Sequence, residues 1–106
     1  MVIKKPIMVA ELSINHLGMV NIAQKMIDSA VEGGADLIKF KFKNVKKYYK
    51  NDGKKWRNFN FKQYRSSLEL SKEDFKHLAE YCDSRGIKWF CTVHDFEGLE
   101  FIMNFD

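Results

Sequence analysis

Proline, cysteine and long apolar runs are all scarce in this chain of 106 residues. A single proline argues against a disordered or linker segment. No stretch approaches the roughly 18 consecutive apolar residues that a membrane helix needs, and residues 1–8 lack the long apolar run of a secretory signal. We therefore expect a cytoplasmic protein without a membrane-spanning segment.

The two cysteines, Cys82 and Cys91, have neither the spacing of a metal site nor that of a redox pair. Free cysteine in a folded protein is most often a small apolar residue of the core. We therefore expect two reduced thiols that pack inside the fold.

Apolar and charged residues are both plentiful, at 45% and 30% of the chain, which is the composition of a globular protein with a core. A chain of this length forms one domain at most. The charge is unevenly distributed, because residues 39–65 hold eleven Lys or Arg and one acid, Asp52. The rest of the chain is net negative.

Hydrophobic periodicity predicts alternating strands and helices. A short apolar run too brief for a buried helix predicts a first strand, of the kind that is covered on both faces. Ser71 and Asp74 form a capping box before one of the helices, and glycines end the first two helices. The predicted strands are 7–14, 35–42 and 87–93, and the helical patterns lie in 22–31, 75–82 and 96–103. Residues 43–65 have no clean period and predict a long loop.

Strand, helix and strand joined by short connections form a right-handed crossover unit, so the predicted fold class is α/β with parallel strands. Three strands cannot close a barrel. The expected architecture is the amino-terminal segment of a TIM-type (β/α)8 barrel with about three β/α units. Residues 1–106 would then be a partial barrel domain.

Polar side chains interrupt the predicted strands near their carboxyl ends, where parallel β/α folds bind ligands. Glu11 is costly to bury as an ionised group unless it meets a partner or a polar ligand. Lys39 and Lys41 share one face of the second strand, and two ammonium groups without nearby acids favour an anion. Thr92 adds a hydroxyl near the end of the third strand. A structural carboxylate, solvated lysines and a packed threonine are the alternatives for each residue alone.

Taken together, four segments resemble the opening of the sialic acid synthase family, which includes N-acetylneuraminate synthase and spore-coat polysaccharide synthases. The similarity covers nearly the whole chain, in order and at compatible spacing. The segments are residues 10–18 (AELSINHLG), 34–40 (GADLIKF), 64–71 (YRSSLELS) and 86–95 (GIKWFCTVHD).

The resemblance implies a barrel that condenses phosphoenolpyruvate with an N-acylmannosamine-type sugar, releases phosphate and uses a divalent metal, Mn or Mg. It assigns Glu11 as the catalytic residue that contacts the sugar and Lys39 as a ligand of phosphoenolpyruvate. Thr92 falls where the family has a hydroxyl on the phosphate side. Asn15 and His16 match an Asn-His pair that shapes the loop at the substrate site.

The chain also departs from the family pattern. Lys41, a further candidate substrate ligand, stands where the family usually has glutamine, so a donor-only cation replaces an amide that both donates and accepts. His94 stands where many members have phenylalanine. The resemblance places the metal-binding histidines and a small carboxy-terminal antifreeze-like domain outside these residues. We therefore expect the isolated chain to be inactive, with no metal ligands of its own.

Three other functions stay open. Residues 43–65 interleave lysines with aromatic side chains, a pattern that also suits a nucleic-acid-binding module, although no familiar binding signature is present. A different barrel that uses phosphoenolpyruvate or a phosphorylated sugar would use strand-end lysines in the same way. A non-catalytic fragment could pair its open sheet edges with a second copy to form a homo-oligomer.

Overall fold

The computed structural model describes residues 4–49 and 59–105 as a three-stranded sheet with five helices in that part of the chain. All strands are parallel, in the order β1-β2-β3, so β2 is central. The α/β prediction with three parallel strands is confirmed. The strands are β1 (Val9–Glu11), β2 (Leu37–Phe42) and β3 (Lys88–Val93), and the helices are α1 (Val20–Glu32), α2 (Val45–Tyr48), α3 (Phe61–Ser67), α4 (Lys72–Ser84) and α5 (Phe96–Ile102).

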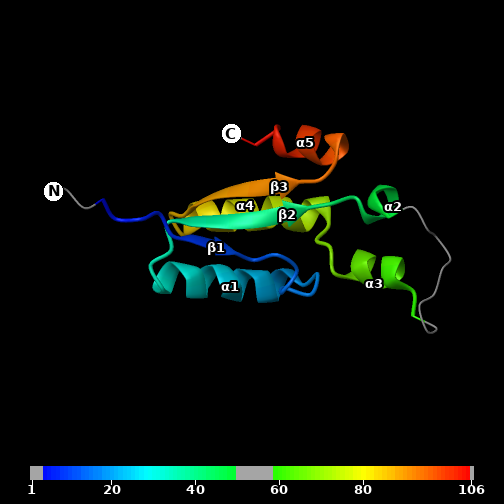
Figure 1. Ribbon diagram of the computed structural model, residues 1–106. Coiled ribbons are helices and arrows are strands. Elements are labelled where there is room, and N and C mark those ends of the chain that lie inside the picture. The colour runs from blue at the N-terminus through cyan, green and yellow to red at the C-terminus, as the bar shows by residue number, and fades with distance from the viewer. Residues whose placement is uncertain (1–3, 50–58, 106) are drawn as a thin grey trace.

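Helices α1 and α4 pack side by side against one face of the sheet, whereas α2 and α3 lie beyond the carboxyl ends of the strands (Figure 1). The predicted start of α4 is confirmed, because the Ser71 side chain accepts a hydrogen bond from the Asp74 backbone N–H at 3.0 Å. Gly34 and Gly86 follow α1 and α4 in the left-handed conformation, as expected for residues that end a helix. None of the helices in the described ranges is long and apolar enough to cross a membrane.

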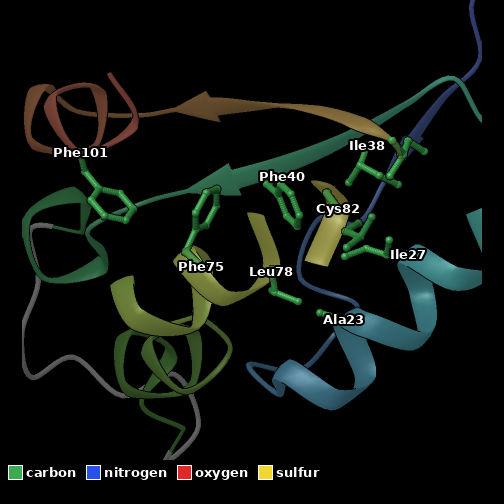
Figure 2. Packing of buried hydrophobic residues seen from close by; sticks show 10 residues of the cluster. Ala23, Ile27, Ile38, Phe40, Phe75, Leu78, Cys82 and Phe101 are labelled. Atoms are coloured by element: carbon green, nitrogen blue, oxygen red, sulfur yellow. The ribbon is translucent and has the colours of Figure 1, made fainter. Parts of the chain in front are cut away.

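The core fills the space between the sheet and its helices (Figure 2). Phe40 on β2 and Phe75 on α4 are each only 1% exposed, and their ring centroids lie 5.0 Å apart. Helices α1, α4 and α5 contribute apolar side chains to the core, as the 3.6-residue period of their sequences predicts. The other buried members are Leu12, Ala23, Ile27, Ile38, Leu78, Cys82, Ile87 and Phe101.

The opposite face of the sheet has no helix over it among the described residues. Along β2, Ile38 and Phe40 are buried toward the helices, while Lys39 and Lys41 alternate onto the other face. Val9 on β1 and Phe90 on β3 are 43% and 42% exposed. The prediction that the first strand is covered on both faces is therefore wrong here, and this strand has three residues rather than eight.

The prediction of a structureless loop over residues 43–65 is wrong for its two ends. Asn44 and Asn60 cap α2 and α3, and their side chains accept hydrogen bonds from the backbone N–H groups of Lys47 and Gln63. The buried residue of α2 is Val45 and that of α3 is Arg65, so neither helix has an apolar stripe that its sequence could reveal. The middle of the segment, residues 50–58, lies outside the described residues.

Both cysteines are free thiols that contact the core. Burial is the main cause that raises the pKa of Cys82 and of Cys91 to about 12. Because only the thiolate reacts, we expect iodoacetamide at pH 8 to alkylate the folded chain at least about 100-fold more slowly than the urea-unfolded chain. Mass spectrometry of timed samples measures this, and equal rates in the two states would contradict the burial of the thiols.

Candidate anion-binding site

One carboxylate and two lysines meet on the open face, at the carboxyl ends of β1 and β2. The Nζ of Lys41 lies 3.0 Å from Oε1 of Glu11, and the Nζ of Lys39 lies 3.9 Å from Oε2. The hydrogen bond from Lys41, followed by the charge of Lys39, lowers the pKa of Glu11. Glu11 is therefore ionised at neutral pH and serves as the counter-ion of both lysines, so the expectation that no acid lies near these lysines is wrong.

Strand register explains this convergence. Glu11 lies beside Lys39 in the β1–β2 ladder, and Lys41 lies beside Thr92 in the β2–β3 ladder. Neighbouring residues of a parallel ladder project on the same side of the sheet. The predicted residues of all three strands thus share one face and one end of the sheet.

The charges of this cluster do not cancel. Glu11 supplies one negative charge against two positive ones, and the side chains of Lys39 and Lys41 are 26% and 37% exposed. Both lysines are held in place by the carboxylate and keep donors that face solvent. The cluster is therefore suited to bind an anion that adds acceptors above the lysines.

The loop after β1 is organised around His16. This side chain is 3% exposed, and its Nδ1 accepts a hydrogen bond from the Gly18 backbone N–H at 3.0 Å. Burial lowers the pKa of His16, which keeps the ring neutral at pH 7. Ser13 and Leu17 adopt positive φ angles of 50° and 58°, a conformation that costs about 1–2 kcal/mol per residue. His16 thus holds a strained loop beside the site, and Asn15 is the exposed member of the pair.

A second set of contacts, which the sequence did not reveal, connects the segments that follow the carboxyl ends of β2 and β3. Asp95 caps α5 by accepting from the Gly98 N–H at 2.6 Å, and its other oxygen accepts from the Asn44 N–H at 3.0 Å. Glu97 accepts from the side chains of Asn44 and Lys47 at 3.1 and 2.9 Å. These bonds tie the start of α2 to the start of α5. The sequence offered one signal, an acid (Asp95) directly before a helical pattern. Such an acid predicts a helix cap, but it does not predict the second hydrogen bond to Asn44, 51 residues away.

Arg65 on α3 is a buried cation that sequence patterns also missed. Its Nη2 lies 3.1 Å from Oε1 of Glu69, and burial raises the pKa of that carboxyl. In the part of the chain that the structure describes, Nη1 of Arg65 is buried and makes no hydrogen bond.

The divalent metal implied by the resemblance has no complete donor set here. Residues 4–49 and 59–105 contain no group of three or more His, Cys, Asp or Glu side chains that could hold a metal ion. Glu11 is engaged by two ammonium groups, which repel a cation. The described residues by themselves therefore offer no complete metal site.

Parallel β/α units with charged side chains at the carboxyl ends of the strands define the class: the arrangement is that of the opening units of a β/α barrel. The sequence pattern of the NeuB family matches residues 26–106, and the chain belongs to this family. Its members are sialic and related nonulosonic acid synthases that condense phosphoenolpyruvate.

Individual relatives agree with this membership. The chain is 32% identical to the N,N'-diacetyllegionaminic acid synthase of Legionella pneumophila, over 91% of its own length and 29% of the relative. It is 29% identical to the N-acetylneuraminate-9-phosphate synthase of Mus musculus, over 89% of its length and 28% of the relative. The crystal structure of an N-acetylneuraminic acid synthetase from Leptospira borgpetersenii superposes with a TM-score of 0.75 at 27% identity, over 92% of this chain and 32% of that one. The chain thus spans about 30% of the length of these relatives and matches the amino-terminal part of their barrels.

Proposed function

We propose that this chain carries the phosphoenolpyruvate-binding part of a nonulosonic acid synthase site, in which phosphoenolpyruvate condenses with an N-acylmannosamine-type sugar and phosphate is released. The observation that carries the proposal is the convergence of Glu11, Lys39 and Lys41 on one face at the carboxyl ends of adjacent strands. Membership of a family of synthases that use this acid supports it.

The geometry suggests a division of roles within the cluster. Lys39 and Lys41 supply charge-assisted hydrogen bonds to the phosphate and carboxylate of the acid, and the Thr92 hydroxyl can donate to the same anion. Glu11 sets the spacing of the lysines and is the acceptor that faces the sugar. Asn15 is exposed on the loop that His16 holds, where it can contact the substrate. A divalent metal bound by residues outside this segment would polarise the sugar aldehyde.

The proposal extends to the activity of the isolated chain and to its assembly. The isolated chain is expected to bind and not to turn over, because its described residues offer no metal site. Residues 1–106 would act as part of a barrel domain in a cytoplasmic enzyme, and pairing with a second copy would cover the open edges of β1 and β3.

Isothermal titration of phosphoenolpyruvate into the chain tests the proposal, with two lysine variants that change the net charge equally. We expect saturable binding that Lys39→Ala weakens about tenfold or more, because a hydrogen bond to a charged group contributes about 1.5–3 kcal/mol. Lys88→Ala is the matched control, since Lys88 is exposed on β3 in register with Leu37, at the amino end of the sheet. We expect Lys88→Ala to change the affinity less than twofold. Equal losses in both variants would show diffuse charge attraction and would overturn the assignment.

A further inference from the structure

His94 is an exposed titratable side chain next to the cluster of Glu11, Lys39 and Lys41. It directly follows β3 and lies two residues beyond Thr92, whose neighbour in the β2–β3 ladder is Lys41. Two residues of chain span at most about 7 Å and neighbouring strands lie about 5 Å apart, so the Cα atoms of His94 and Lys41 lie within about 12 Å of each other. The imidazole therefore stands at the same end of the sheet as the strand lysines.

A ring contact and a backbone hydrogen bond hold His94 in this place. Its ring centroid lies 5.6 Å from that of Tyr48, at an interplanar angle of 78°. The Nζ of Lys43 lies 4.0 Å from the centre of the same Tyr48 ring. The Asn44 N–H donates to the Asp95 carboxylate at 3.0 Å, which joins the residue after Lys43 to the residue after His94. The end of β3 is thereby fixed to the segment that follows β2.

Positive groups on three sides disfavour the protonated form of this imidazole. Partial desolvation is the largest cause that lowers the pKa of His94. The charges of Lys43 and Lys41 lower it further, Asp95 opposes them, and Arg65 on α3 adds a smaller effect in the direction of the lysines. The ring is therefore mainly neutral at pH 7 in the free chain.

A bound anion would reverse this balance. Negative charge placed on Lys41 offsets the cations that oppose protonation, and a nearby opposite charge favours the charged form of an imidazole. Glu69 already offsets part of the Lys43 charge, and the positive groups still outweigh Asp95 at His94. A protonated imidazole donates from both ring nitrogens, whereas a neutral one donates from only one. Occupancy of the cluster and protonation of the ring therefore favour each other.

We propose that His94 is a further ligand of the phosphoenolpyruvate site and that it takes up a proton from solvent when the acid binds. The proton adds to the free ring nitrogen, and the bound acid gains a cationic donor on the β3 side of the site. This role rests on the proposed function, because phosphoenolpyruvate is the anion. A His94 that only supported the loop would leave no proton uptake to be lost on its replacement.

Isothermal titration of phosphoenolpyruvate into the full chain at pH 5.5 and pH 8 tests the coupling, with His94→Phe compared with the unaltered chain. The ratio of the two dissociation constants at each pH cancels the titration of the acid's own phosphate. We expect the advantage of the unaltered chain to grow about threefold or more from pH 8 to pH 5.5, as a rise of about one pH unit in the pKa of His94 on binding would produce. The gain develops as the pH falls through the pKa of His94 in the complex, because only the protonated ring prefers the bound state.

Two further variants separate proton uptake from other causes. His77→Phe removes an exposed imidazole from α4, on the other face of the sheet, and should change the ratio less than about 1.5-fold between the two pH values, because salt screens an exposed charge there. His94→Gln keeps a hydrogen-bond donor but takes up no proton, so it should behave like His94→Phe. Equal effects at the two histidines, or an unchanged pH dependence in His94→Gln, would overturn the coupling.

Calorimetry in buffers of different ionisation enthalpy counts the protons directly. At pH 6, binding should take up about 0.3 protons or more in excess of the uptake in His94→Phe. Equal proton counts with binding intact would overturn the role of His94 and leave the proposed function standing. If phosphoenolpyruvate shows no saturable binding at any of these pH values, the proposed function fails and the role of His94 fails with it.

Discussion

Phe75→Ala should remove about 3–5 kcal/mol from the free energy of unfolding, the usual cost of deleting a buried aromatic ring. Phe75 is 1% exposed and contacts rings from β2, β3 and α5 as well as from the residues after α5. Its centroid lies within 6.2 Å of five others, those of Phe40, Phe42, Trp89, Phe101 and Phe105. A small domain has only about 5–15 kcal/mol in total, so this variant should be close to unfolding at room temperature.

Urea unfolding followed by tryptophan fluorescence measures the effect. Phe96→Ala is the matched control, because Phe96 begins α5 and is 89% exposed. This control should change the stability by less than about 0.5 kcal/mol. A loss below about 1 kcal/mol in Phe75→Ala would contradict the single core that unites the sheet with α4 and α5.

Gly18→Ala should cost about 2–4 kcal/mol and should also loosen the loop that carries Asn15 and His16. Gly18 has a φ of +73°, which alone costs a residue with a side chain about 1–2 kcal/mol. A Cβ at this position would lie 2.5 Å from the backbone oxygen of Ser67, so either the loop or the end of α3 must also move. The Gly18 N–H also donates to Nδ1 of His16 at 3.0 Å, so a shift of the loop would disturb this hydrogen bond.

Gly34→Ala separates the two causes. Gly34 has a φ of +84°, and an added Cβ would meet nothing within 4 Å. It should therefore show the conformational cost of about 1–2 kcal/mol without the steric one. Thermal unfolding of both variants measures the difference, and equal losses would mean that the contact between the first loop and α3 is absent in solution.

The elements with a clear hydrophobic period were predictable from the sequence, whereas α2 and α3, which have none, were not. The apolar stripe of α4 and its serine cap predicted that helix, and the alternation of Phe and Lys predicted β2. The asparagine caps of α2 and α3 stand in a segment rich in lysine and aromatic residues, and neither helix has an apolar stripe, because the buried residues are Val45 and Arg65. The first strand was predicted too long because residues 12–14 are as apolar as a strand, although they begin a turn.

The sequence predicted which side chains share a face of the sheet, but not which of them contact one another. A spacing of two residues places Lys39 and Lys41 on one side of a strand in any register. The ion pair with Glu11 depends on the register of β1 against β2, which the sequence of a parallel sheet does not specify. The contact between Tyr48 and His94 depends on α2, a helix without an apolar stripe.

Mapping of phosphoenolpyruvate on the chain by amide chemical shifts tests the central claim most directly. We expect the largest saturable changes at the carboxyl ends of the three strands on the open face, around Glu11, residues 39–42 and Thr92. Amides around Lys88, at the amino end of β3, should stay within the noise. Changes concentrated on α3, or spread evenly over the basic segment, would contradict the account and favour a surface that attracts polyanions without a formed site.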